Sequence, residues 1–499
     1  MDILDSLLAG FSVALSAHAL LFCFVGASVG MLIGVLPGIG ALATISILLP
    51  FTFYLEPMIG LIMLAGVFYG AQYGGSTASI LLNLPGTASS AVTALDGYPM
   101  AKAGRAGSAL FVTTITSFVG GSIAIVAMIL LAPFVAAIAL QFGSTEYFSV
   151  MLLSLVAAST LSPGSMFKGL AMVVFGLLLG TVGADAMTGV YRFTFGRLEL
   201  AEGINLIAIV MGLFGISEVL ANLAGGAQPT RLTERVSLRS MIPSRDESRR
   251  SVAPTFRGTL VGIVTGILPG LGPQVASFVA YAVEKKLSRT PERFGSGMVE
   301  GIAAPEASNN ASVQAAFIPT LTLGIPGDAV MAVMVGALMM HGVLPGPQLI
   351  SEEPDLFWGL IASFWIGNLI LLVLNIPLIG VWLQILRIPY RLLYPSILAL
   401  ICMGIYSIRN SEFDVLMAIL FGLVGYGMLL LELPAAPLLL GFVLGPLVEE
   451  HLRRALIISR GSLDVFVTSP VSLAALLLTA LLILGMLLPP LVRRLRRRG

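Results

Sequence analysis

The sequence has few charged residues, and this scarcity excludes most classes of soluble protein. Only 11% of its 499 residues are Asp, Glu, Lys or Arg, whereas 57% are hydrophobic. Soluble domains carry roughly 25% charged residues. A water-soluble fold could not hide so much apolar surface, because even large domains leave much of their surface in water. The solvent must therefore be lipid, and soluble enzymes, nucleic-acid-binding proteins and disordered scaffolds are excluded.

Cysteine and histidine are almost absent, which removes two further kinds of site. Cys23 and Cys402 both lie inside apolar runs, so they predict no disulfide framework. The three histidines, His18, His341 and His451, are isolated, and their spacing indicates no metal site. The sequence contains no GxxxxGK[ST] motif, so we do not expect ATP hydrolysis by that route. No resident cofactor is expected.

Basic residues are missing from the N-terminal region and concentrated in two later segments. None precedes Lys102, whereas residues 228–257 hold seven arginines and residues 493–498 hold five. Positive segments that flank membrane spans stay in the cytoplasm, so we expect both segments there. Without a basic N-terminal region, the first apolar run is expected to be a retained span rather than a cleaved signal peptide.

Long apolar runs follow one another through the chain. A helix that crosses the hydrocarbon core needs about 20 such residues, and the runs predict roughly 11–14 membrane segments. The predicted fold is an all-α polytopic membrane protein with broken helices or re-entrant hairpins. We expect a first membrane repeat at 1–225, an Arg-rich cytoplasmic linker at 226–256, and a second membrane repeat with a basic cytoplasmic tail at 257–499.

The two halves of the chain resemble each other. Three segments match in the same order, and the first match is identical at six of eleven positions. The matches are GMLIGVLPGIG at 30–40 with GIVTGILPGLG at 262–272, GSTASI at 75–80 with SNNASV at 308–313, and LPG at 84–86 with IPG at 325–327. They predict an internal duplication that pairs Ser76 and Thr77 with Asn309 and Asn310. Whether the repeats are parallel or inverted stays open.

The matched Pro-Gly pairs are expected to break helices inside the membrane. Proline removes a backbone donor and clashes with the preceding turn, and glycine permits left-handed torsions. Freed backbone groups are tolerated at membrane depth only where protein or a watery cavity surrounds them. Matched breaks are typical of transporters in which half-helix N-termini face an anionic substrate between two repeats. A simple kink is the alternative for any single break.

Hydroxyls, amides and a few carboxylates lie beside these breaks. We predict that substrate carboxylates meet backbone amides there, and that hydroxyl, amide and carbonyl oxygens bind a coupling cation. The predicted substrate-binding residues are Gly38, Gly40, Ser76, Asn83, Pro85, Gly86, Thr87, Gly270, Gly272, Pro326 and Gly327, and the predicted cation-binding residues are Ser76, Thr77, Asn309, Asn310 and Asp328. Asp328 has a helix N-cap as its alternative role. For Glu300 and Glu306, the alternative to a role in the site is a position at the membrane interface.

Three classes of function compete on these observations. Duplication and broken segments favour a secondary transporter. An intramembrane enzyme would need a partner for Ser76 or Asp328, and no convincing partner motif is present, so we do not expect an enzyme. A channel or a structural membrane subunit also uses broken helices, but a channel would show no saturation and no uphill accumulation.

Two long segments resemble a known family. They are GVLPGIGALATISILLPFTFYLEP at 34–57 with FYGAQYGGSTASILLNLPGTASSAVTALDGYPMAKAGRAGSAL at 68–110, and GILPGLGPQVASFVAYAVEKKLSRTPERFGSGMVEGIAAPEASNNASVQAAFIPTLTLGIPGDAVMAVMVGALMMHGVLPGP at 266–347. Both closely resemble the large membrane subunit of the tripartite tricarboxylate transporters (TctA type), over nearly the whole chain.

The resemblance implies a secondary transporter in the bacterial cell inner membrane. Such systems work with a periplasmic solute-binding protein and a small membrane subunit, and import citrate or other di- and tricarboxylates by symport. A sodium or proton gradient drives uptake, and the scarcity of buried carboxylates and histidines in this sequence favours sodium. The carboxylate itself is not identified by the sequence.

Overall fold

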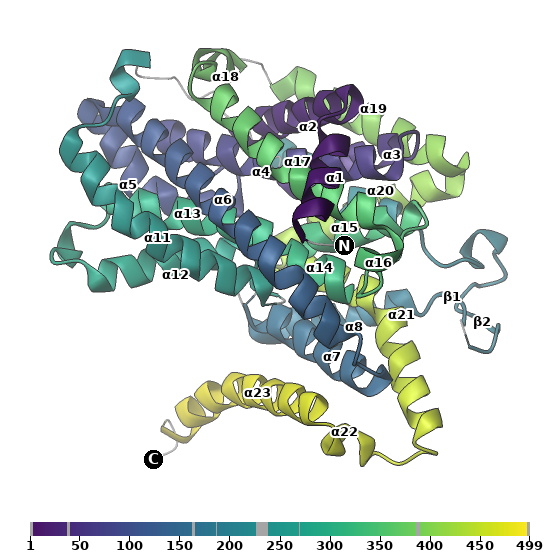
Figure 1. Cartoon of the computed structure of the whole chain (residues 1–499). Helices are drawn as coiled ribbons and strands as arrows, with labels where there is room; N and C mark the ends of the chain where they lie inside the picture. Colours follow the sequence, from purple (N-terminus) through teal and green to yellow (C-terminus); the bar gives the residue numbers. More distant parts are fainter. Residues whose placement is uncertain are drawn as a thin grey trace.

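The structure of this chain, a computed structural model, is almost entirely helical (Figure 1). It describes residues 3–36, 40–161, 165–185, 187–225, 238–268, 270–385 and 390–496. The expected all-α membrane architecture is confirmed. The first part of the predicted Arg-rich linker, residues 226–237, lies outside the described residues, as do Pro37, Gly38 and Pro269.

The described first half of the chain contains four of the long apolar helical stretches and a short strand pair. Its elements are α1 (Ile3–Ala14), α2 (Ala17–Val35), α3 (Ala41–Thr52), α4 (Pro57–Leu82), η1 (Ala88–Ser90), α5 (Ala91–Met100), η2 (Ala101–Arg105), α6 (Ala106–Ala139), α7 (Ser144–Leu161), α8 (Met166–Gly180), β1 (Gly183–Ala184), β2 (Tyr191–Arg192), η3 (Leu198–Leu200), α9 (Leu206–Val210), η4 (Met211–Ile216) and α10 (Ser217–Gly225). The antiparallel pair β1 and β2 was not predicted from the sequence, because each strand is only two residues long.

The second half begins with a broken hairpin. Its elements are η5 (Leu238–Met241), α11 (Arg245–Ile267), α12 (Gly272–Leu287), η6 (Pro291–Arg293), α13 (Glu300–Ala315), α14 (Phe317–Leu323), α15 (Ala329–Met340), α16 (Leu349–Glu352), α17 (Pro354–Asn375), α18 (Ile379–Ile385), α19 (Tyr390–Arg409), α20 (Glu412–Leu430), α21 (Ala435–Ile458), α22 (Val465–Thr468) and α23 (Pro470–Arg496). α23 lies along the lower edge of Figure 1, beside α7.

Within the described residues, seven helical stretches are long and apolar enough to cross a membrane. Shorter apolar helices of 10–17 residues accompany them, among them α3, α8 and α15. Among these, α3 and α15 follow the matched Pro-Gly breaks, because proline and glycine interrupt apolar runs that look continuous in the sequence. The protein is therefore a multi-pass membrane protein in which part of the apolar sequence forms half-length helices.

The two broken hairpins are α2–α3 in the first half and α11–α12 in the second, and they pack in the same manner. Gly26, Gly30 and Gly34 on α2 face backbone atoms of Met63, Val67 and Ala71 on α4. Gly258, Gly262 and Gly266 on α11 face Ala304, Ser308 and Ser312 on α13. In each pair the numbers rise together, so the helices run parallel. A glycine every fourth residue allows the two backbones to approach closely, as small residues do in membrane helix pairs.

The two hairpins enter from opposite ends of the molecule. α4 and α13 run antiparallel, because Ser76 hydrogen-bonds Glu306 while Ile80 packs in one cluster with Ile302. α2 is parallel to α4, and α11 is parallel to α13. The breaks after α2 and α11 consequently meet from opposite sides, between α4 and α13.

Candidate functional site

The helix breaks of the two halves line one cavity of about 340 Å³. Five residues that the sequence analysis placed at the site border it: Gly40, Thr87, Gly270, Gly272 and Asp328. They come from positions as far apart as 40 and 328, so the fold has brought both halves together here. The pairing of the breaks predicted this meeting.

The first turns of four helices of twelve or more residues border the cavity. These are the beginnings of α3, α12, α15 and α21, represented in the lining by Ala41, Pro273, Ala329 and Pro437. The first backbone N–H groups of a helix have no partner inside the helix, and the helix dipole places partial positive charge there. An anion in this cavity would therefore meet several N–H donors at once.

The break of the second half is held together by its own backbone. The N–H of Gly270 donates to the carbonyl of Gly327 at 2.7 Å, which ties the α11–α12 break to the one before α15. Gly270 has φ +88° and its added Cβ would lie 2.5 Å from the Ala158 nitrogen, so a larger residue does not fit. Asp328 accepts a 2.8 Å hydrogen bond from the Met331 N–H, which makes it the N-cap of α15.

A chain of polar side chains forms the wall contributed by the first half. Thr87 Oγ1 lies 3.0 Å from Ser89 Oγ, which donates to Gln72 Oε1 at 2.7 Å. All three residues border the cavity. Thr87 also caps η1, where its backbone N–H donates to Ser90 Oγ at 3.2 Å. These contacts hold the break between α4 and α5 rigidly against the cavity.

Other predicted site residues lie outside this cavity. Gly38 is not among the described residues. Asn83 and Pro85 are exposed, and Asn83 ends α4 in a left-handed conformation at φ +58°. Gly86, Pro326 and Gly327 are buried in the breaks but do not border the cavity. The remaining predicted residues that are buried without bordering it are Ser76, Thr77, Asn309 and Asn310.

One of those four residues, Ser76, contacts a second buried feature, the carboxylate of Glu306. Ser76 Oγ donates to Glu306 Oε1 at 2.7 Å, and Asn310 Nδ2 donates to the Glu306 carbonyl at 3.2 Å. Thr77 bonds only the Tyr73 carbonyl of its own helix. Asn309 is 1% exposed, and neither polar atom of its side chain has a hydrogen-bond partner. Glu306 is also 1% exposed, so its side chain is enclosed by the protein.

Glu300, which the sequence analysis considered together with Glu306, lies at the start of α13 and forms an ion pair with Arg250 at 2.7 Å. Nearby, Arg257 pairs with Glu284 at 2.6 Å. Arg105 pairs with Glu247 at 3.0 Å. These ion pairs fasten η2, α12 and the start of α13 to α11 at this end of the molecule.

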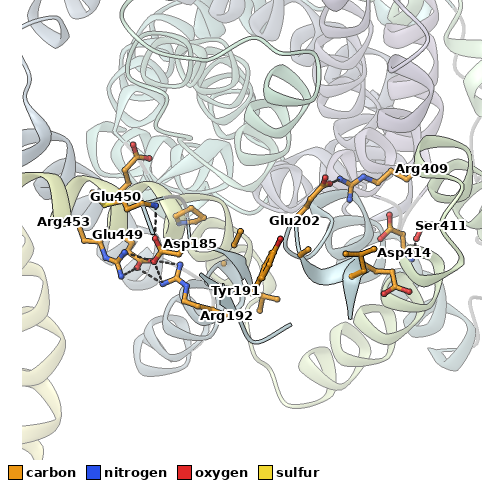
Figure 2. Close-up of a pocket in the computed structure, with 18 residues that line it drawn as sticks. Asp185, Tyr191, Arg192, Glu202, Arg409, Ser411, Asp414, Glu449, Glu450 and Arg453 are labelled. Atoms are coloured by element: carbon orange, nitrogen blue, oxygen red, sulfur yellow. Dashed lines mark hydrogen bonds and ion pairs between the residues drawn. The ribbon is translucent and has the colours of Figure 1, made fainter. Parts of the chain in front are cut away.

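A larger cavity of about 1000 Å³ lies at the surface, near β1 and β2 (Figure 2). Asp185 stands between Arg192 and Arg453, at 3.4 and 2.7 Å, and Glu449 pairs with both arginines. The N–H groups of Met187 and Thr188 and the Arg453 guanidinium lower the pKa of Asp185 to about 2. Because these charges already neutralise one another, the smaller cavity is the better candidate for substrate.

Sequence reasoning missed some residues of the smaller cavity. Gln72 lies one helical turn before Ser76, and Gln274 lies in the first turn after Gly272, so both were close to recognised motifs. The beginning of α21, at Ala436 and Pro437, carried no such signal. Its apolar sequence reads as an ordinary span, and only the tertiary fold brings it to the breaks.

Comparison with known proteins agrees with this geometry. Residues 20–440 match the model of the Tripartite tricarboxylate transporter TctA family. An Agrobacterium vitis protein described as "Uncharacterized 52.8 kDa protein in TAR-I ttuC' 3'region" is 51% identical over 493 residues, which cover 99% of this chain and 98% of that protein. A second, "Uncharacterized protein in TAR-II ttuC' 3'region" from the same organism, is 54% identical over 43% of this chain and 89% of its own length. No solved structure matches the chain.

The family match covers both broken hairpins and the cavity between them, and the full-length relative covers nearly the whole chain. The family is one of transporters and not of enzymes. This chain therefore belongs to the TctA family, the large membrane component of tripartite tricarboxylate transporters.

Proposed function

We propose that this subunit imports a di- or tricarboxylate by coupling it to a sodium gradient, and that the substrate binds in the 340 Å³ cavity. The convergence of four helix N-termini there is the observation that carries the proposal. Backbone N–H groups and the dipoles of these helices favour a carboxylate. No lysine or arginine is among the described residues that border the cavity.

The lack of a basic side chain supports coupling to a cation. A bound carboxylate would add negative charge beside Asp328, the one charged residue among those described in the lining. Burying unpaired charge costs several kcal/mol. A sodium ion held by oxygen atoms of Thr87, Ser89 or Asp328 would offset that cost, so that the anion binds well only to the cation-loaded protein.

We further propose that the two halves are repeats of inverted topology. The same three-glycine contact joins α2 to α4 and α11 to α13, and the two hairpins enter from opposite ends. Inverted repeats with broken helices around a central site are a common design of secondary transporters, in which one part rocks or slides against the other to expose the site alternately.

The partners and the location follow from the family as proposals. A periplasmic solute-binding protein would deliver the carboxylate, a small membrane subunit would complete the complex, and the complex would lie in the bacterial inner membrane. Apolar faces such as that of α23, where Leu477 and Leu481 are more than half accessible, would face lipid or the small subunit.

The test is uptake of labelled carboxylates into vesicles that contain this chain and its two partners. A sodium gradient and a proton gradient are imposed separately, with and without the binding protein. We expect uphill uptake that needs sodium and the binding protein. Asp328→Asn is the informative variant, because asparagine also caps helices well and so retains the α15 N-terminus while it removes the charge.

The Asp328→Asn variant is expected to weaken the sodium dependence of uptake more than the selection among carboxylates. Equal losses in both would contradict the assignment of Asp328 to the cation. Downhill flux that does not saturate would indicate a channel, and absence of uptake of every acid by an assembled complex would contradict the substrate class.

A further inference from the structure

Glu306 is a fully buried carboxylate that the proposed sodium site does not use. It lies on α13 where this helix crosses α4, α5 and α6, and it is 1% exposed. Ser76 of α4, Thr93 of α5 and Ser117 of α6 all donate to it, with Ser117 at 3.3 Å from Oε2. One carboxylate therefore joins four helices that come from both halves of the chain.

No basic side chain offsets the charge of Glu306 among the residues that the structure describes. Every described ion pair lies elsewhere. An ionised carboxylate buried without a cation is costly even when hydrogen-bonded. The group therefore needs a proton or a bound cation for part of its working cycle.

The neighbouring helices hold few groups that could take the place of such a cation. α4 carries Tyr73, whose hydroxyl donates to Asn368 Oδ1 at 3.0 Å, and α6, α14 and η1 contain no ionisable residue. Asp96 on α5 and Tyr281 on α12 bond each other at 3.0 Å. On α11, α12 and the start of α13, Arg257 pairs with Glu284 and Arg250 pairs with Glu300. The other basic residues of α11 and α12 are exposed, namely Arg245, Arg249, Lys285 and Lys286.

The spacing around Glu306 suits a proton better than a metal ion. Ser76 Oγ is 2.7 Å from Glu306 Oε1, a direct hydrogen bond that leaves no room for an ion between the two atoms. Ser76 Oγ also lies 3.1 Å from the Gln72 carbonyl oxygen. With an ionised carboxylate, the single Ser76 hydrogen is shared between Glu306 and the Gln72 carbonyl. With a protonated carboxyl, Glu306 can donate to Ser76 instead, and Ser76 can then give its hydrogen wholly to Gln72.

The same serine connects Glu306 to the substrate cavity. Ser76 bonds the main-chain carbonyl of Gln72, whose side-chain oxygen accepts from Ser89, and Ser89 contacts Thr87. Gln72, Ser89 and Thr87 border the cavity. When Glu306 loses its proton, Gln72 must share the Ser76 hydrogen with the carboxylate, and this change acts directly on the residue that positions the cavity wall.

We propose that Glu306 is a proton-binding site that is coupled to the substrate cavity through Ser76 and Gln72, so that a proton is carried as a second co-substrate beside the cation of the cavity. The proton binds to the carboxylate when the site faces the outside and leaves it, as a proton returned to water, on the inside. This inference rests on the proposed function, because it assigns a second coupling site to the same transporter.

Two measurements test it on the assembled complex. The first is infrared difference spectroscopy of the complex without substrate across a pH titration. It detects the C=O stretch of a protonated carboxyl. The band that titrates should be lost in Glu306→Gln. The second is proton flux into vesicles that contain a pH-sensitive dye, driven by a substrate gradient. Substrate-driven proton flux should be abolished in Glu306→Gln, whereas exchange of labelled for unlabelled substrate should continue.

The variants Ser76→Ala and Ser154→Ala form a matched pair. Ser76→Ala removes the connection to Gln72 and should leave the carboxyl band while it uncouples proton flux from substrate flux. Ser154 is equally buried, but its hydroxyl bonds only the Val150 carbonyl of its own helix, so Ser154→Ala should change neither reading.

Several results would overturn the proposal. The carboxyl of Glu306 would be purely structural if its infrared band did not change with pH. The same conclusion would follow if proton flux persisted in Glu306→Gln. A sodium-dependent shift of the band without proton flux would assign the site to sodium instead. If the spectroscopic titration is present but no variant transports any acid, the proposed function fails while the proton site stands.

Discussion

At the scale of the residue, Asp185 shows how one side chain can hold a surface loop without a large apolar core. It accepts hydrogen bonds from the N–H groups of Met187 and Thr188, at 2.8 and 3.0 Å, and lies between Arg192 and Arg453 (Figure 2). The side chain is 5% exposed. The backbone bonds fix the turn between β1 and β2, and the arginines fasten that turn to α21.

Asp185→Asn is expected to loosen this loop at neutral pH, because it removes the charge that both arginines share. Met187 and Thr188 amides should exchange hydrogen faster than in the wild type, after correction for intrinsic rates. The contacts lower the pKa of Asp185 to about 2 from 3.8. A lowered pKa gives stability that is complete above the unfolded value and is lost as the pH falls through the folded value.

The difference between Asp185→Asn and the wild type should therefore be constant from pH 7 down to about pH 5 and shrink between about pH 4 and pH 2. Hydrogen exchange followed by mass spectrometry of peptides that begin before Asp185 and include Met187 and Thr188 provides the measurement. A difference that already disappears near pH 6 would mean that histidine or another group controls the loop instead.

Residue chemistry was only partly accessible from the sequence. Asp328 beside Pro326-Gly327 was recognised as important, and both its cavity position and its N-cap role were anticipated. The surroundings of Glu306 were not, because Ser76, Thr93 and Ser117 come from three other helices. No spacing within one segment reveals contacts between residues that are up to 230 positions apart.

At the scale of the element, the glycines of α2 and α11 determine how closely the broken hairpins approach the long helices. A Cβ added at Gly30 would lie 2.3 Å from the Val67 carbonyl oxygen, and one added at Gly262 would lie 2.3 Å from that of Ser308. Backbone atoms cannot move aside as a flexible side chain would, so either substitution must separate two helices.

Gly30→Ala and Gly262→Ala are each expected to destabilise the protein by about 1–3 kcal/mol, the usual cost of overpacking a close contact. Gly427→Ala is the matched control. Its added Cβ meets nothing within 4 Å, and alanine is the better helix former by up to about 1 kcal/mol. Thermal unfolding in detergent gives the comparison. Equal midpoints for Gly30→Ala and Gly427→Ala would show that the α2–α4 contact is loose.

If the halves are repeats, as proposed, the glycine contacts favour a register between them that differs from part of the sequence matching. Gly30 packs against Val67, and Gly262 packs against Ser308. Along the sequence, Val67 and Ser308 are separated by the same number of residues as Pro85 and Pro326. Extending that register pairs Ser76 with Phe317 rather than with Asn309 or Asn310. Short polar matches are unreliable guides here, because small and polar residues recur along both helices for packing reasons.

At the scale of the whole molecule, the sequence predicted an all-helical membrane protein but left its orientation open. Hydrophobic runs and Pro-Gly breaks are local properties, and they were read correctly as broken helices. The direction in which each hairpin enters depends on how many segments cross fully, and the sequence does not separate a half-length helix from a complete span. The antiparallel contact of α4 with α13 supplies the missing information.

If the two hairpins enter the membrane from opposite sides, the end of α3 and the end of α12 should be accessible from opposite faces of the membrane. Tyr54, just after α3, is 66% exposed, and Leu287, the last residue of α12, is 60% exposed. In a chain with Cys23 and Cys402 replaced by alanine, Tyr54→Cys should react with a membrane-impermeant maleimide only from the face opposite the Arg-rich linker. Leu287→Cys should react only from the linker face, together with the control Arg239→Cys in η5.

Labelling of intact cells and of inside-out vesicles separates the two faces, and arginine-rich segments identify the linker face as cytoplasmic. Because α12 ends beside Arg257, through its ion pair with Glu284, its end belongs to the linker side. Because Gly60 of α4 contacts Thr52, α3 ends beside the beginning of α4, at the other side. Labelling of Tyr54→Cys and Leu287→Cys from one common face would require parallel hairpins, and the proposed inverted design of the transporter would then have to be abandoned.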